Sequence, residues 1–196
     1  PVFRDGAVER TLPVSLFYDL EQIRSQNDGQ PAGLVVYSLG YSACTPSAHS
    51  LANMLAQRGY VFAVPNHNDI VAVCLCLPDT SGAVVVPDNG QLVGNPALEE
   101  FYNQDRGKGF SEDQLEEFFY YRDADIFATV EHLTNTETYA FGSLKDKPVI
   151  LVGYSIGGWN VLNVAGAGNL FPELHCNVTA IICQNTFVGE LTEDRI

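Results

Sequence analysis

The sequence predicts an α/β fold, in which helices cover both faces of a mostly parallel sheet. Two short apolar runs, Leu34–Tyr37 and Pro148–Val152, are bounded by glycines or turn residues, which is typical of strands buried on both faces of a parallel sheet. Between them, residues 47–59 and 111–134 carry apolar residues at helical spacing. Strands that alternate with helices in this order form βαβ units with right-handed crossovers.

The first elements are a strand and its connection to the first apolar run. Residues 11–18 alternate loosely between apolar and polar positions, which predicts an opening strand. Residues 25–30 are polar and rich in turn formers, so we expect a hairpin or another strand connection there. Ser47 is a candidate N-cap for the helix that ends near Gly59, and residues 60–64 begin the next strand.

The middle of the chain contains a long segment that favours irregular structure. Residues 78–110 are dense in glycine and proline, which predicts an excursion outside the core, and such excursions often carry substrate contacts. The helix of residues 111–134 follows it, then the strand of residues 148–152 and a helix of small residues to about residue 166. We therefore interpret residues 1–196 as part of one domain.

Composition and charge exclude several classes of function. The chain has 24 acidic and 10 basic residues and a net charge of −14, so it would repel a nucleic acid backbone. No segment approaches the roughly 18 uninterrupted apolar residues of a membrane helix. The 5 cysteines show no CxxC or Cys/His cluster at zinc spacing, so we expect no metal site.

The cysteines and one sequon favour an exported protein, either secreted or periplasmic, with a cytoplasmic location as the alternative. We expect Cys176 and Cys183 to form a disulfide, and the odd number of cysteines leaves at least one thiol without a partner in the chain. Asn177 begins an Asn-Val-Thr glycosylation sequon. The chain begins at Pro1 without a leader, which suggests a processed chain or a fragment.

The motif that carries chemistry is Gly153–Gly157, which matches G-x-S-x-G and places Ser155 at its centre. This pattern is weak by itself, but here an apolar strand ends directly at Gly153 and a helix begins after Ser155. In such a nucleophile elbow, the serine lies on a strained turn, and glycines two residues before and after it relieve steric crowding. We therefore expect Ser155 to be a nucleophile.

With this motif, the chain resembles the α/β-hydrolase superfamily, and within it the dienelactone hydrolase and platelet-activating-factor acetylhydrolase-like group. The resemblance covers most of the chain and rests on residues 12–14, 34–42, 55–69, 122–126 and 153–157. It implies main-chain oxyanion donors at Tyr41 and Ile156. The family's Ser-His-Gly-Leu-Gly loop reads Ser-Leu-Gly-Tyr-Ser here, and it lacks the histidine.

The catalytic base and acid are not evident in the sequence. The resemblance implies the order serine, acid, histidine along the chain, and His175 is the only histidine after Ser155, too close to it in sequence. His49 and His67 follow predicted strands, and His132 lies on a predicted helix surface. We interpret each of these as structural.

Two interpretations of the tail remain open. In the first, residues 178–183 form the sixth strand, and the acid position falls at Gln184 or Asn185, which are not acids. In the second, which we prefer, residues 170–190 are a cap insertion and Asp194 opens the sixth strand. Both leave an α/β-hydrolase-type fold that is incomplete at its C-terminal side, before the acid and the base.

These observations lead to two hypotheses. The first is a serine hydrolase that cleaves short-acyl or lipid-like carboxylic esters through an acyl-enzyme on Ser155, without a metal or an organic cofactor. A companion segment from the C-terminal part of the same precursor would then supply the acid and the histidine. The alternative is a catalytically silent binding module of the same fold. A cysteine-dependent hydrolase is disfavoured because the elbow carries a serine.

Overall fold

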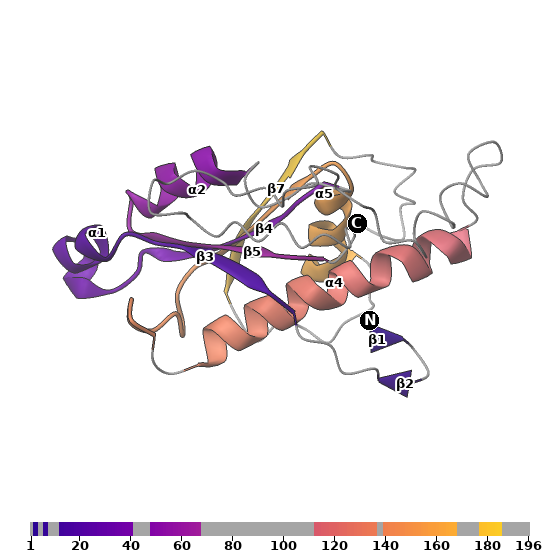
Figure 1. Ribbon diagram of the computed structural model, residues 1–196, viewed down its shortest axis with the longest axis horizontal. Coiled ribbons are helices and arrows are strands. Elements are labelled where there is room, and N and C mark those ends of the chain that lie inside the picture. Colours follow the sequence, from indigo (N-terminus) through magenta and orange to yellow (C-terminus); the bar gives the residue numbers. More distant parts are fainter. Residues whose placement is uncertain are drawn as a thin grey trace, which may run out of the picture.

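The computed structural model describes residues 2–3, 6–7, 12–40, 48–67, 112–136, 139–167 and 177–185. Its centre is a five-stranded sheet with the strand order β3-β5-β4-β6-β7 (Figure 1). These strands are β3 (Val14–Phe17), β4 (Gly33–Ser38), β5 (Tyr60–Pro65), β6 (Val149–Tyr154) and β7 (Val178–Gln184). Strand β3 is antiparallel to β5 and the other pairs are parallel, which confirms the prediction of a mostly parallel sheet. The short strands β1 (Val2–Phe3) and β2 (Gly6–Ala7) pair separately.

Within the described residues, four α-helices connect or follow these strands: α1 (Leu20–Ser25), α2 (His49–Ala56), α4 (Glu112–Asn135) and α5 (Ile156–Leu162). A 3₁₀ turn (Asn27–Gly29) follows α1, and a π-helical turn (Asn163–Ala167) extends α5. The predicted helix of residues 111–134 corresponds closely to α4. The predicted N-cap of α2 was wrong, because the cap is Ala48 without a side-chain hydrogen bond, and Ser47 lies outside the described residues.

Of the two expected alternatives after the first strand, the structure shows a strand connection and not a hairpin. Strand β3 pairs with β5 and not with β4, and α1 lies between β3 and β4 in the chain. The carboxylate of Asp19 accepts hydrogen bonds from the N–H groups of Glu21 and Gln22, both at 3.0 Å. This side-chain cap starts the helix, and Ile23 anchors it in the core with 1% exposure.

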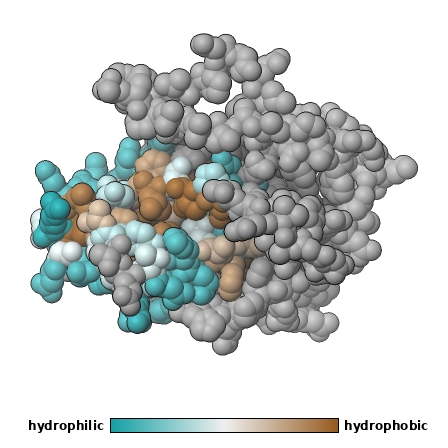
Figure 2. All heavy atoms as spheres, turned by 60° about the horizontal axis from the view of Figure 1, so that its bottom comes forward, coloured by the Kyte–Doolittle hydropathy of each residue, from teal (hydrophilic) through white to brown (hydrophobic). Residues whose placement is uncertain are grey.

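The core has two layers, one on each face of the sheet. Leu34 and Val36 of β4 face a layer that includes Ile126 of α4 and residues of α5. The alternate residues Val35 and Tyr37 face the other layer, where α2 packs. The prediction that helices cover both faces is therefore confirmed. On the face shown in Figure 2, the margins of the described surface are hydrophilic, and hydrophobic side chains gather beside the grey residues.

Strand β7 is at the edge of the described sheet, and most of its residues are exposed. Ile181 and Ile182 lie on opposite faces of this strand and are 41% and 46% exposed. Residues 178–184 are thus a strand of the central sheet, as in the first interpretation of the tail, and not part of the cap that we preferred. The other residues of the predicted cap, apart from Asn177 and Asn185, lie outside the described residues, as does the predicted excursion at 78–110.

None of the described helices has both the length and the hydropathy that a membrane crossing requires.

Candidate active site

Ser155 occupies the sharp turn between β6 and α5, as predicted. Its backbone angles are φ 54° and ψ −123°, a conformation that costs a non-glycine residue about 1–3 kcal/mol. Two backbone hydrogen bonds hold it there: the Ser155 N–H donates to the Gln184 carbonyl at 2.8 Å, and the Ser155 carbonyl accepts from the Gly158 N–H at 3.0 Å. Strand β7 and helix α5 together therefore impose the strained conformation.

The two glycines of the motif are required by backbone packing. A Cβ atom at Gly153 would lie 2.1 Å from the Gly157 carbonyl oxygen, inside the elbow itself. A Cβ atom at Gly157 would lie 2.1 Å from the carbonyl oxygen of Ser38, at the end of β4. The first contact agrees with the predicted crowding within the turn. The second shows that Gly157 also allows α5 to approach the neighbouring strand.

The parallel sheet and the strained serine between strand and helix are the features that define a nucleophile elbow. The chain has the α/β-hydrolase fold. The side chain of Ser155 is half-buried and that of Tyr154 is exposed, so the turn is at the surface. Within the described residues, no hydrogen bond to Ser155 Oγ is found, so no base for this hydroxyl is identified there.

Comparisons with known proteins find only distant similarities. No protein-family model matches the sequence, and no curated protein sequence matches it significantly. A ferulic acid esterase from Streptomyces cinnamoneus is 21% identical with a TM-score of 0.43, and the match covers 68% of this chain and 32% of the esterase.

Two further solved structures are similar. A soluble variant of monoglyceride lipase from Saccharomyces cerevisiae is 14% identical, with a TM-score of 0.43 over 89% of this chain and 41% of the lipase. A dienelactone hydrolase-like promiscuous phosphotriesterase from metagenomic libraries is 16% identical, with a TM-score of 0.45 over 90% of this chain and 60% of that protein. The chain thus spans about a third to three fifths of the length of these structures.

The segment that leaves β4 passes directly beside the elbow. A Cβ atom at Gly40 would lie 3.4 Å from the Ser155 Cβ and 3.1 Å from Cδ1 of Tyr154. Ile156 is the first residue of α5, and N–H groups in the first turn of a helix have no partner within the helix. This position suits the predicted oxyanion donor. Tyr41, the other predicted donor, lies outside the described residues.

A second serine takes part in a buried network beneath the elbow. Ser38 Oγ lies 3.0 Å from His67 Nε2, and His67 Nδ1 lies 3.1 Å from Asp125 Oδ2. The order of atoms is that of a Ser–His–Asp triad, but Ser38 has 0% exposure and cannot meet a substrate. Both ring nitrogens of His67 are engaged, which favours the structural role predicted for this histidine. The network ties the ends of β4 and β5 to α4.

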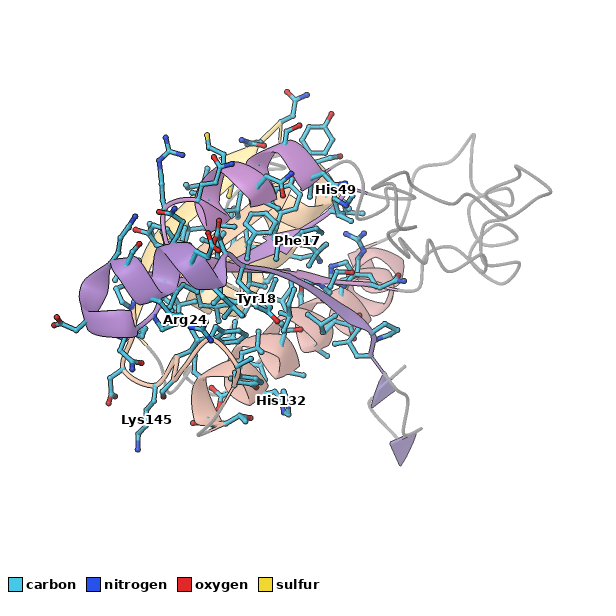
Figure 3. All side chains as sticks on the ribbon, turned by 60° about the vertical axis from the view of Figure 1, so that its left-hand side comes forward. Phe17, Tyr18, Arg24, His49, His132 and Lys145 are labelled. Atoms are coloured by element: carbon cyan, nitrogen blue, oxygen red, sulfur yellow. The ribbon has the colours of Figure 1, made fainter. Side chains whose placement is uncertain are left out.

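The remaining histidines do not approach the elbow in any described contact. His49 begins α2 and packs edge-on against Phe17, with ring centroids 5.2 Å apart (Figure 3). His132 is exposed on α4, far from His49 in the same view, as predicted for a helix surface. His175 lies outside the described residues.

The sequence reasoning missed a second buried polar cluster, between α4 and α5. Arg122 and Asp123 are 1% and 0% exposed. Asp123 accepts hydrogen bonds from Asn160 at 2.7 Å and from Asn163 at 3.0 Å. Burial raises the pKa of Asp123 to about 7, although these two hydrogen bonds and the charge of Arg122 act in the opposite direction. The available signal was the run Arg122–Asp125, whose charges adjoin apolar helical positions such as Ile126.

The other predicted site residues are only partly described. Asn177 is exposed immediately before β7, so its side chain is accessible, and its glycosylation stays a prediction. Cys183 Sγ lies 3.5 Å from the Gly158 carbonyl oxygen. Cys176 lies outside the described residues, so its pairing with Cys183 is not tested, and no disulfide is found within the described part of the chain. That part also contains no cluster of three or more His, Cys, Asp or Glu side chains suited to a metal ion.

Proposed function

We propose that the protein is a serine hydrolase that cleaves carboxylic esters through an acyl-enzyme on Ser155. The observation that carries this proposal is the strained backbone of Ser155, held between β6 and α5 by hydrogen bonds at both ends. Strain of this kind persists only where the surroundings impose it, and it presents the serine hydroxyl above the end of the sheet.

The reaction takes place in two steps at the Ser155 hydroxyl. Its oxygen attacks the ester carbonyl carbon while a base takes its proton, and the resulting oxyanion accepts hydrogen bonds from the main-chain N–H groups of Ile156 and Tyr41. The tetrahedral intermediate then expels the leaving oxygen, which takes the proton from the protonated base and departs as the alcohol. Water, deprotonated by the same base, attacks the acyl-enzyme, and the carboxylic acid leaves as the proton returns to the Ser155 oxygen. The resemblance to dienelactone hydrolases and platelet-activating-factor acetylhydrolases suggests short-acyl or lipid-like esters.

The base and the acid come from a companion segment of the same precursor. Two observations support this part of the proposal. Among the described histidines, His67 is engaged in a buried network, and His49 and His132 have no described contact with Ser155. In addition, β7 is the last strand of the described sheet, next to β6, and most of its residues are exposed. A further strand there would cover the edge and bring its own loops to the elbow.

A fluorophosphonate probe tests the proposal in the complete protein, including the companion segment. We expect the probe to attach to the peptide that contains Ser155, and the attachment to disappear in Ser155→Ala. The matched control is Ser25→Ala, because Ser25 is an exposed serine of α1 outside the site. This variant should be labelled like the original protein. A folded complete protein that is not labelled at Ser155 would support the silent binding module instead.

A further inference from the structure

Arg122 inserts its guanidinium group between α4 and the end of β4. Nη1 donates to the Leu39 carbonyl at 2.9 Å, and Nη2 donates to the Gly40 carbonyl at 3.3 Å. Nη1 also donates to Oδ1 of Asn160, in α5, at 3.1 Å. The side chain therefore binds two successive carbonyls of one segment and one residue of a neighbouring helix, in a position where it is 1% exposed.

The carbonyls that Arg122 binds belong to the backbone beside the nucleophile. Gly40 approaches Ser155 so closely that a Cβ atom there would lie 3.4 Å from the Ser155 Cβ. On the other side, a Cβ atom at Gly157 would meet the Leu39 carbonyl oxygen at 2.7 Å. The end of β4 is thus confined between Arg122 and the elbow.

We propose that Arg122 is a positioning residue for the oxyanion hole, an inference that rests on the proposed function. A peptide unit is planar and trans, so the N–H that follows a carbonyl points away from the group that binds the carbonyl. By holding the Leu39 and Gly40 carbonyls in the protein interior, Arg122 fixes the end of β4, from which the chain continues to the proposed donor Tyr41. Its bond to Asn160 holds α5, whose first residue supplies the other donor, Ile156.

The choice of arginine agrees with this role. Two adjacent carbonyls require two donors in a fixed geometry, and the planar guanidinium provides them, whereas the lysine ammonium is a single flexible point. A buried positive charge is costly unless it is well hydrogen bonded. Here its bond to Asn160 also continues to Asp123, because the same amide donates to that carboxylate at 2.7 Å. An arginine that only linked the helix to the strand would not need to bind the carbonyls of Leu39 and Gly40, which lie beside the elbow.

The test compares oxygen esters with the corresponding thionoesters in the complete protein. Sulfur is a weaker hydrogen-bond acceptor than oxygen, so a well-aimed oxyanion hole favours the oxygen ester, and the ratio of the two rates reports on the hole. In Arg122→Lys, we expect kcat for the oxygen ester to fall by about 10-fold to 100-fold and the rate ratio to fall in parallel. The KM should change less than about threefold, since the group acts on the transition state.

Two other variants separate positioning from loss of stability. Val130→Ala removes buried volume from the same helix, two turns from Arg122, without touching the end of β4. This variant should lower the melting temperature and leave the rate ratio unchanged. Asn160→Ser removes one of the Arg122 acceptors and should give a smaller decrease in the same ratio, which keeps the test available if Arg122→Lys does not fold.

The outcomes distinguish this inference from the proposed function. The role of Arg122 alone is overturned by one combination of results. In this combination, the probe labels Ser155 in the original protein, and folded Arg122→Lys or Asn160→Ser has an unchanged kcat and an unchanged rate ratio. A decrease in the ratio of the same size in Val130→Ala also overturns it, because the effect would then follow stability. An original protein that is not labelled at Ser155 overturns the proposed function, and this inference with it.

Discussion

Ser155 combines an unfavourable backbone conformation with a hydroxyl that makes no described hydrogen bond, so its side chain contributes little to the stability of the fold. Its position depends on its neighbours: Gln184 and Gly158 fix its main chain, and Gly153 and Gly157 leave room for the turn. Substitution of Ser155 should therefore affect mainly activity, whereas substitution of Gly153 or Gly157 should affect mainly stability.

The first prediction concerns Ser155, the proposed nucleophile. In the complete protein, Ser155→Ala should reduce kcat for ester hydrolysis by on the order of 10⁶-fold, the loss typical of enzymes with a catalytic triad. Its melting temperature should stay within a few degrees of the original, because only a half-buried hydroxyl is removed. Activity assays and thermal unfolding check this. An alanine variant that retains a tenth of the activity would exclude Ser155 as the nucleophile.

The second prediction concerns Gly157. Gly157→Ala should destabilise the protein by more than about 3 kcal/mol, because its Cβ would overlap the backbone oxygen of Ser38 and neither segment can move without disturbing the sheet. Gly29→Ala is the control. Gly29 has φ +75° but no heavy atom near its Cβ position, so it tests the conformational penalty alone. Equal losses in urea unfolding would contradict the steric explanation.

The elbow could be predicted from sequence because all of its determinants are local. A strand, five residues and a helix are continuous in the chain, and two glycines at fixed offsets mark the turn. The Arg122 cluster could not be predicted in the same way, since its partners Leu39 and Gly40 are more than 80 positions away. Charged residues on a helix usually indicate a solvated face, and only the tertiary structure shows that these are buried.

Helix α4 is the element that connects the polar groups beneath the site. Arg122, Asp123 and Asp125 bond respectively to the end of β4, to α5, and to His67 just after β5. The apolar residues Ile126 and Val130 of the same helix fill the core layer. One helix therefore fixes the carboxyl ends of two strands and the helix that follows Ser155.

The third prediction is a dependence of stability on pH that arises from Asp123. The pKa of this carboxyl rises from 3.8 to about 7 on burial. Between these values the folded state binds more protons than the unfolded state, so the free energy of unfolding should fall as the pH rises from about 4 to about 7. Below this interval both states are protonated, and the contribution of Asp123 is fully present.

Urea unfolding at pH 5 and pH 8 checks this dependence. Asp123→Asn should lose less stability over this interval than the original protein, since the amide does not ionise. Asp146→Asn is a suitable control, because it replaces a carboxylate that is exposed. Equal losses in the original protein and in Asp123→Asn would show that Asp123 does not titrate in this range.

At the level of elements, sequence periodicity predicted the long features and failed on the short ones. Helix α4 and strands β4, β5 and β6 were predicted because each is a continuous apolar or periodic run. Helix α1 was missed because it has six residues, and its start depends on the side-chain cap at Asp19. Strand β7 remained ambiguous because an edge strand and a disulfide-bonded cap can share the same apolar composition.

For the whole molecule, the described sheet is asymmetric. Residues of β4, at its centre, are buried, and those of β7 are exposed on both faces. At the opposite edge, every residue of β3 is partly buried. An exposed edge with alternating Ile181 and Ile182 would be prone to pair with another strand. Within the described residues, the exposed edge is therefore on the side of the sheet that carries Ser155, where we propose that the companion segment binds.

The last prediction is that esterase activity requires the companion segment seated against β7. Ile182→Lys should weaken the association of the companion segment with β7 and reduce activity. The reason is that the segment would then bury a charged side chain in place of the apolar Ile182 side chain. Met54→Lys is the matched control, since Met54 on α2 is 44% exposed against 46% for Ile182. Intact mass of the purified active protein should reveal the segment, either as a second chain or within a longer chain, with about 80–200 additional residues from ordinary domain sizes. If residues 1–196 alone hydrolyse esters through Ser155, no companion is needed, and a histidine of this chain must act as the base.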